Sequence, residues 1–294
     1  MDYLLKDLVK NNIFKLKMNN FQNFINELYL RLYGDEFLPS KIGADDGCDG
    51  ILKKEIIFAI YGPDEKKTLA ELKGKIKSDY KKYNEKWKDK YPKWLFIYNG
   101  EFSAKVYPVF DELGNGVDKI DINHLIEKID SLNWGIKRDI LINILKIPEE
   151  YITKNIFQEI IEDLLKNNQS GKTPKTNPPN LIEKIRLNFS KEDEDSMIKM
   201  YNESYPEVAE FGNLLNQREN EEIIALKNKV LEGYMRLSGD FKSRFNNLIK
   251  DIAEKNKNEE VYLNSVRIGL LYLFEICLIG KEVNKKDDIS TARI

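Results

Sequence analysis

Three aspartates crowd a short glycine-rich segment, GADDGCDG at residues 43–50, directly before an apolar stretch. Carboxylates this close together repel one another, and a divalent cation would relieve that repulsion. Ligation by oxygen alone suits magnesium or calcium, and glycine lets the backbone approach an ion or a phosphate closely. The same residue types also favour an ordinary surface turn, because Asp and Gly stabilise turns through local interactions. The segment is therefore a candidate metal-binding loop, and its alternative is a solvent-exposed turn.

Regular elements predicted on both sides would hold this segment in place. Residues 18–33 carry apolar side chains at helical spacing, and residues 34–50 form a loop rich in Gly, Asp and Pro. The apolar, β-rich run 56–61 predicts a strand that is buried on both faces. Residues 64–87 then predict a long polar helix, and residues 93–100 a second apolar strand that ends in Asn-Gly. This order indicates an α/β sandwich with a mixed or parallel sheet.

A run of Asp and Gly between an amphipathic helix and an apolar strand resembles the PD-(D/E)XK nuclease family. The resemblance implies an α/β restriction-endonuclease-like domain over residues 1–120 and a Mg²⁺ or Mn²⁺ cofactor. It implies that Asp49 holds the metal and that Asp45 is the earlier acid of the run. Glu27, on the preceding helix, matches an additional ligand of many members. Such a metal would activate water and stabilise the charge that develops on the phosphate.

The strand after the loop departs from the family pattern. The family has Glu or Gln, one spacer residue and Lys, whereas this sequence has Ala59 and Tyr61 at the two positions. The run AIYGP at 59–63 resembles a subgroup among defence-island proteins that reads Gln, apolar, Tyr, Ala or Gly, Pro. In that subgroup the lysine comes from the following helix, and Tyr61 is a further catalytic candidate. The helix offers Lys66, Lys67, Lys73 and Lys75, of which Lys73 and Lys75 are the preferred candidates; the alternative is a solvated helix face.

The second half of the chain is helical in its spacing of apolar residues. Residues 121–170 predict a helical extension of the first domain. Residues 171–180 concentrate Pro, Gly, Thr and Asn and predict a linker. Residues 181–294 then predict an all-α assembly domain.

The segment LYLFEICLIGKEV at 271–283 resembles the end of the C-terminal domain of ABC-three-component defence systems. In physical terms it is an apolar helix with a glycine cap at Gly280. The resemblance implies an effector of the Lamassu type. Its partners would be an SMC-like ABC ATPase subunit and a small accessory subunit, and the nuclease-like domains would form a homo-oligomer when active.

Composition and single residues exclude several other classes. The formal net charge is −2, so a nucleic-acid surface must be local. His124 is the only histidine, which argues against Ser-His-Asp catalysis and His-rich zinc sites and suits a helix surface. No GxxxxGK[ST] motif is present, so any ATP chemistry would belong to a partner. Two distant cysteines, no membrane-length apolar run and no signal-peptide pattern fit a reducing cytoplasm.

Three functions from different classes remain open at this level. The leading hypothesis is a metal-dependent DNA endonuclease of an anti-phage or anti-plasmid defence complex, controlled by partner ATPase subunits. The first alternative is a nuclease-fold scaffold or DNA-binding subunit without catalysis, which Ala59 and Tyr61 favour. The second is a purely structural helical adaptor.

The lysine- and aromatic-rich run 81–94 could contact phosphates and stack on bases, or could be an ordinary solvated helix face.

Overall fold

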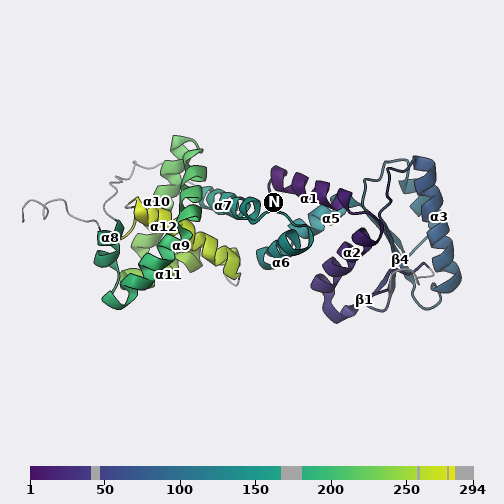
Figure 1. Ribbon diagram of the computed structural model, residues 1–294, viewed down its shortest axis with the longest axis horizontal. Coiled ribbons are helices and arrows are strands. Elements are labelled where there is room, and N and C mark those ends of the chain that lie inside the picture. The colour runs from purple at the N-terminus through teal and green to yellow at the C-terminus, as the bar shows by residue number, and fades with distance from the viewer. Residues whose placement is uncertain (41–46, 167–180, 257–258, 277, 282–294) are drawn as a thin grey trace, which may run out of the picture. The chain divides into compact units, whose positions relative to one another are not determined.

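The chain divides into two compact units, residues 1–148 and residues 149–294. The computed structural model describes residues 1–40, 47–166, 181–256, 259–276 and 278–281. Unit 1 is mixed α/β, and unit 2 is helical throughout its described residues (Figure 1). The expected layout, an α/β half followed by a helical half, is confirmed at this level.

Unit 1 starts with two helices, continues through a sheet with one long crossover helix, and ends in short helices. Its elements are α1 (Tyr3–Lys15), α2 (Met18–Tyr33), η1 (Gly34–Glu36), β1 (Phe37–Pro39), β2 (Gly50–Leu52), β3 (Ile56–Tyr61), α3 (Leu69–Lys86), β4 (Lys93–Tyr98), α4 (Tyr107–Leu113), β5 (Val117–Ile120), α5 (Ile122–Asp130), α6 (Trp134–Asp139) and η2 (Ile140–Ile144). The helix predicted at residues 18–33 and the strand predicted at 56–61 are confirmed at those bounds.

Five strands in the described part of unit 1 form one mixed sheet in the order β1-β2-β3-β4-β5. The first three are antiparallel neighbours, and β3, β4 and β5 run parallel. The parallel strands therefore end at the same edge of the sheet, and α3 connects β3 to β4. β1 lies within the segment predicted as a loop, and β2 begins at its last residue. Strands of three residues are too short to show the alternation that identifies a strand.

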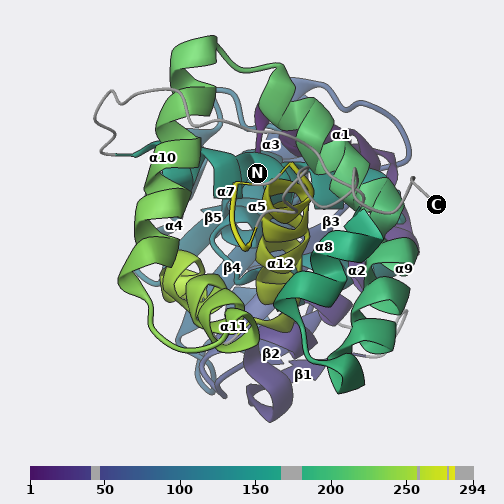
Figure 2. The same ribbon diagram turned by 90° about the vertical axis from the view of Figure 1, so that its left-hand side faces the viewer.

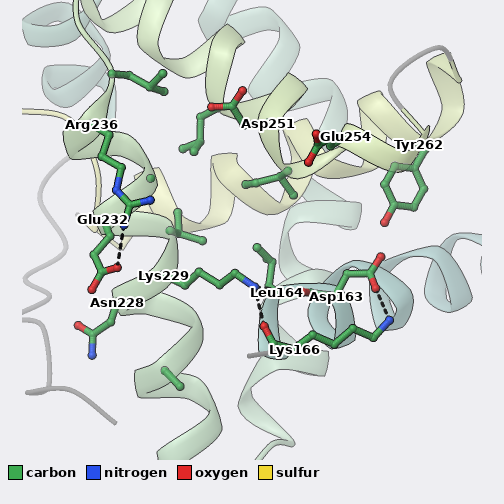
Figure 3. Close-up of a pocket in the computed structure, with 16 residues that line it drawn as sticks. Asp163, Leu164, Lys166, Asn228, Lys229, Glu232, Arg236, Asp251, Glu254 and Tyr262 are labelled. Carbon is green, nitrogen blue, oxygen red and sulfur yellow. Dashed lines mark hydrogen bonds and ion pairs between the residues drawn. The ribbon is translucent and has the colours of Figure 1, made fainter. Parts of the chain in front are cut away.

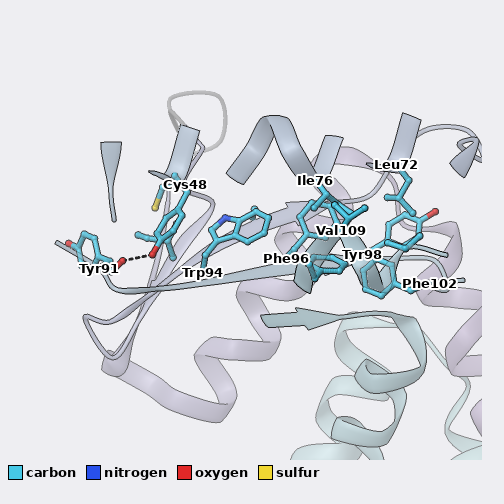
Figure 4. Packing of buried hydrophobic residues seen from close by; sticks show 14 residues of the cluster. Cys48, Leu72, Ile76, Tyr91, Trp94, Phe96, Tyr98, Phe102 and Val109 are labelled. Atoms are coloured by element: carbon cyan, nitrogen blue, oxygen red, sulfur yellow. Dashed lines mark hydrogen bonds between the residues drawn. The ribbon is translucent and has the colours of Figure 1, made fainter. Parts of the chain in front are cut away.

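Helices cover both faces of this sheet, and the alternation of side chains along β3 decides which residue meets which layer. Ile57 and Ala59 belong to an apolar cluster shared with α3 and α4 (Figure 4). Phe58 points to the other face, where its ring packs edge-on against Tyr29 of α2, with 4.7 Å between centroids. Cys48, which directly precedes Asp49, is buried in the α3-side cluster.

Helix α3 has a well-defined start and one buried stripe. Thr68 and Glu71 form a capping box, in which each side chain bonds the backbone N–H of the other. The buried positions then recur at helical spacing: Leu72, Ile76, Asp79 and Tyr83. A carboxylate therefore occupies a position that the spacing would assign to an apolar side chain.

The lysine- and aromatic-rich run 81–94 contributes its aromatic residues mainly to the core. Tyr83, Tyr91 and Trp94 are buried, and the Tyr83 hydroxyl donates a hydrogen bond to the carbonyl of Tyr91 at 2.8 Å. Buried rings offer no face on which a base could stack. The stacking hypothesis for these three residues is therefore wrong. The buried aromatic residues of the run belong to the core, and its lysines belong to a solvated face.

The predicted helical extension 121–170 is divided between the two units. Helix α5 packs against α1, and Asp121 caps its first turn through the amides of Asn123 and His124. His124 lies on this helix with its side chain 54% exposed, as expected for a surface histidine. The units separate at residue 148 because the next helix packs among the C-terminal helices. The predicted linker 171–180 lies outside the described residues.

Unit 2 packs its helices around α12. Its elements are α7 (Glu149–Leu165), α8 (Leu181–Asn188), α9 (Lys191–Asn216), α10 (Asn220–Arg236), α11 (Phe241–Ile252), η3 (Glu254–Asn256) and α12 (Glu260–Glu275). Figure 2 shows α12 with α8 and α9 on one side and α10 and α11 on the other. Among the described residues, no helix is both long and apolar enough to cross a bilayer.

The end of α12 is held by a buried lysine from α8. Lys184 is fully buried and donates a hydrogen bond to the carbonyl of Phe274 at 2.5 Å, with its ammonium also over the Phe274 ring. The predicted glycine cap at Gly280 is wrong, because α12 ends at Glu275 and its cap residue is Ile276. Gly280 instead takes a φ of +87° in the following turn, where a side chain would meet Asn188, Phe241 and Phe274.

We expect Lys184→Met to loosen α8 and α12, because the substitution leaves the buried Phe274 carbonyl without its charged donor. The expected cost is about 1–3 kcal/mol. In amide hydrogen exchange of the full chain, peptides from α8 and α12 should exchange at least about tenfold faster in this variant than in the wild type. Lys199→Met is the matched control, because Lys199 is 76% exposed on α9. Equal exchange in the two variants would contradict the role given to Lys184.

Candidate functional site

A cavity of about 380 Å³ in unit 1 lies where β3 ends, between the start of α2 and one face of α3. Three lysines and three aspartates line it among the described residues. The lining residues are Met18, Asn19, Gln22, Gly47, Asp49, Ala59, Ile60, Tyr61, Gly62, Pro63, Asp64, Lys67, Lys75, Asp79 and Lys82. The cavity therefore combines balanced charge with the end of a buried strand.

Asp49 is positioned by the pairing of β2 with β3. Gly50 lies opposite Phe58 in this antiparallel ladder, so extending the register by one residue sets Asp49 opposite Ala59. The Asp49 amide donates to the carbonyl of Phe58 at 2.9 Å, and its carboxylate accepts from the amide of Ile60 at 2.6 Å. Backbone hydrogen bonds thus hold the carboxylate at the cavity.

Two glycines bring helices close to this strand end. Gly47 has a φ of +88°, and a Cβ there would lie 2.9 Å from Cβ of Lys82 on α3. Gly62 lies against α2, where a Cβ would be 2.7 Å from Cβ of Phe21. A side chain at either position would push a helix away from the cavity.

Lys75, Asp79 and Tyr61 form a contact group on the α3 side of the cavity. The Lys75 ammonium donates to the Asp79 carboxylate at 2.9 Å, and it lies 5.4 Å from the centre of the Tyr61 ring. The Asp79 side chain is only 9% exposed, whereas Lys75 is 38% exposed. The helix therefore presents a buried carboxylate and an accessible ammonium four residues apart.

The Tyr61 hydroxyl acts as a donor at neutral pH. Burial raises the pKa of Tyr61, and the carboxylates of Glu71 and Asp79 raise this pKa further. A tyrosine with a raised pKa keeps its proton, so it can donate a hydrogen bond to an anion but is not a base.

The first turn of α2 forms the opposite wall. Its N-cap residue, Lys17, makes no side-chain capping hydrogen bond, and backbone carbonyls serve the first amides instead. The Met18 amide donates to the carbonyl of Gly62, and the amides of Asn20 and Phe21 donate to the carbonyl of Lys17. Gln22, one turn further, buries its Nε2 with no hydrogen-bond partner among the described residues. An orphaned amide costs about 1–3 kcal/mol. A polar ligand in the cavity would supply the missing partner.

The structure brings part of the predicted site together. Asp49, Tyr61 and Lys75 line the cavity, and so does Lys67. Lys66 and Lys73 do not line it. Asp45 lies outside the described residues.

Glu27 also lies apart from the lining residues. Its carboxylate is 53% exposed and accepts from Arg31 at 2.5 Å, and Arg31 also bonds Asp139. Glu27 is thus one member of a surface ion-pair group, while Gln22 occupies the position on α2 that faces the cavity.

Asp49 is the residue at this cavity that would hold a Mg²⁺ or Mn²⁺ ion. Magnesium in proteins is commonly held by one or two carboxylates, with water and substrate phosphate completing its shell. Asp49 supplies a carboxylate oxygen, and the orphaned Gln22 amide marks a place for a polar ligand. Among the described residues, no three His, Cys, Asp or Glu side chains group as a metal cage.

A larger cavity of about 840 Å³ lies in unit 2, between α7, α10, α11 and the start of α12. Charged side chains in its lining bond to the helices that form it. Lys229 donates to the carbonyls of Asp163 and Lys166 at the end of α7, and Lys166 bonds the Asp163 carboxylate (Figure 3). Lys229 thus caps a helix, and this cavity is the weaker candidate for chemistry.

No protein-family model, no curated protein and no solved structure matches this chain. The chemistry of the site therefore has to be argued from its own residues.

Three polar cavity residues escape the sequence analysis, namely Gln22, Asp64 and Asp79, whereas Lys82 belongs to the lysine-rich run 81–94. Asp79 carries a usable signal, because it interrupts the apolar stripe of Leu72, Ile76 and Tyr83 at a core position. Gln22 and Asp64 carry none, since glutamine is ordinary on a helix surface and aspartate is ordinary in a loop.

We expect Gly47→Ala to destabilise unit 1 by about 1–3 kcal/mol, because alanine is strained at positive φ and its Cβ meets Lys82. Gly74→Ala is the matched control. Gly74 is exposed in α3 with open space around it, so alanine should stabilise unit 1 by about 0.5–1 kcal/mol. All three tryptophans lie in unit 1, so tryptophan fluorescence during urea unfolding of the full chain reports this unit. Effects of the same sign in both variants would refute the close approach at Gly47.

Proposed function

We propose that this chain is a metal-dependent DNA endonuclease and that the cavity at the end of β3 is its active site. One observation carries the proposal: Asp49, the Ala59–Tyr61 strand segment and Lys75 line the same cavity. The PD-(D/E)XK resemblance had connected these positions through sequence alone. The β2–β3 register supports that connection, because it sets Asp49 opposite the strand position of the motif.

The chain's own groups suit work on a phosphodiester. Asp49 would hold Mg²⁺ or Mn²⁺, which when bound activates water and offsets phosphate charge. Lys67, Lys75 and Lys82 present ammonium groups to an anionic backbone. The protonated Tyr61 hydroxyl would donate to a phosphate oxygen.

Unit 2 serves, in this proposal, as the part that assembles with partner subunits of a bacterial defence complex. Its support is the resemblance of residues 271–283 to ABC-three-component proteins, together with the helical character of the unit. The partners are an SMC-like ABC ATPase subunit and a small accessory subunit. Control by them, and homo-oligomerisation of the nuclease-like units on activation, would keep cleavage silent until needed in the cytoplasm.

A catalytically inactive scaffold or DNA-binding subunit of the same kind of complex is the second candidate. Two observations favour it. Ala59 offers no acid on β3, and Glu27 is engaged with Arg31 outside the cavity. Such a protein would bind DNA at low salt through its lysines without cutting it.

The two candidates differ in a cleavage assay on supercoiled DNA with Mg²⁺ or Mn²⁺. We expect cutting by the wild-type chain and loss of about 100-fold or more in Asp49→Asn and Lys75→Met, since the first removes the carboxylate that would hold the metal and the second an ammonium that would contact the reacting phosphate. Lys73→Met is the matched control, because Lys73 is on the same helix but does not line the cavity. It should cut as the wild type does.

The assay is run with the chain alone and again with its neighbouring subunits and ATP. Cutting that appears only in the complex and is lost in Asp49→Asn supports a controlled nuclease. DNA binding without cutting in both arms establishes the scaffold instead.

A further inference from the structure

The mouth of the cavity at the end of β3 carries an exposed apolar side chain. Met18 is the first residue of α2, lines the cavity and is 60% exposed. Its amide donates to the carbonyl of Gly62 at 2.5 Å, so its backbone is fixed to the residue that follows Tyr61. Single exposed apolar residues are common on protein surfaces and need no explanation by themselves. The backbone and the neighbours of Met18 set it apart.

The backbone of Met18 is strained. Its φ is +45°, and among the described residues it is the only non-glycine residue of this lining with a positive φ. Gly adopts such a conformation freely and Asn tolerates it, whereas it is unfavourable for methionine. Strained residues cluster at binding sites, because the surrounding structure has to hold them in place. The conformation of the chain therefore does not account for a methionine, and an apolar side chain is held at the mouth at a cost in stability.

Behind this mouth, hydrogen-bond donors from three elements line the cavity. The Lys75 ammonium of α3 gives one N–H to Asp79, which leaves two for other partners, and the side chain is 38% exposed. The Tyr61 hydroxyl of β3 keeps its proton, because burial raises its pKa. On α2, the Nε2 donor of Gln22 is buried with no acceptor among the described residues. The oxygen atoms of a phosphate group accept hydrogen bonds from all three kinds of donor.

The charge of the lining limits which anion fits. Three lysines and three aspartates line the cavity, so its formal charge is balanced. The Asp79 carboxylate accepts from Lys75, and the Asp49 carboxylate accepts from the amide of Ile60. A phosphodiester with one negative charge suits this lining better than a chain of phosphates, which would bring several charges close to the same carboxylates.

The size of the cavity and its mouth indicate which part of a nucleic acid would enter. The volume of about 380 Å³ lies at the lower end of the range for small-molecule sites, which fits a group such as one nucleotide. A nucleotide combines a charged phosphate with an apolar base face, and these match the lysines and Met18 of the lining. A paired base is stacked inside its duplex, whereas an unpaired base can turn out toward a side chain.

We propose that the cavity binds one unpaired nucleotide of a DNA single strand, with its phosphate on Lys75 and Tyr61 and its base against the side chain of Met18. The inference rests on the proposed nuclease function and names the form of DNA that the site takes. Contact of a thioether with the face of a base does not depend on the identity of the base, so this binding tolerates any sequence.

The test measures DNA binding by the full chain at low salt with EDTA, by fluorescence anisotropy. The probes are a labelled single strand of about ten nucleotides and a blunt duplex of the same sequence. We expect the wild-type chain to bind the single strand at least about tenfold more tightly than the duplex, since the duplex would have to unpair a base first.

Met18→Asn removes the apolar side chain and keeps a residue that tolerates a positive φ. We expect it to bind the single strand at least about threefold more weakly than the wild type. Met235→Asn is the matched control, because Met235 is 69% exposed on α10 and does not line the cavity. It should bind as the wild type does.

Two further variants cover a structural effect at this position. Met18→Gly also suits the positive φ and should lose the same affinity if Met18→Asn does not fold. Met18→Leu keeps an apolar side chain at the same backbone cost and should bind within about twofold of the wild type. Equal losses in Met18→Leu and Met18→Asn overturn the contact with the base.

Lys75→Met separates this inference from the proposed function, because both place a phosphate on Lys75. Weaker binding in Lys75→Met together with wild-type binding in Met18→Asn, or a duplex bound as tightly as the single strand, overturns the unpaired nucleotide and leaves the nuclease proposal standing. Wild-type binding in both variants overturns the phosphate contact in both proposals. A wild-type chain that binds neither DNA overturns this inference, and the cleavage assay then decides the nuclease proposal alone.

Discussion

The antiparallel pairing of β2 with β3 is the interaction on which the rest of the site depends. Two hydrogen bonds extend this pairing beyond the end of β2. The Asp49 amide donates to the carbonyl of Phe58, and the Ile60 amide donates to the side-chain carboxylate of Asp49. A slip of one residue would turn Asp49 away from α3, because side chains alternate between the two faces of a strand. The register therefore decides whether the aspartate loop has any relation to Lys75 and Asp79.

Close approach of the layers adds a second constraint to this register. Gly47 lets the aspartate loop pass directly against α3, and Gly62 lets the end of β3 meet the first turn of α2. The cavity is the space left between these contacts. Its walls come from one strand and two helices, so the separation of its charged groups is set by packing rather than by any one element.

Helix α3 contributes more charged side chains to this cavity than strand β3 does. The strand keeps the apolar character that the core requires, with Ala59 and Phe96 in the shared cluster. Helix α3 carries the polar groups instead, at the cost of interrupting its buried stripe with Asp79.

The sequence by itself determined the elements that have strong periodicity. It predicted the helix at 18–33, the strand at 56–61 and the helical character of the second half, because burial imposes a regular apolar spacing there. It also pointed to Asp49, Tyr61 and Lys75, through residue types in an ordered run.

β1 and β2 were too short to produce a period, and the boundary at residue 148 follows from which helices pack together. The tertiary structure alone decided that Glu27 pairs with Arg31 outside the cavity and that Gln22 and Asp79 line it. Those assignments depend on contacts between residues distant in sequence, and a local pattern carries no record of such contacts.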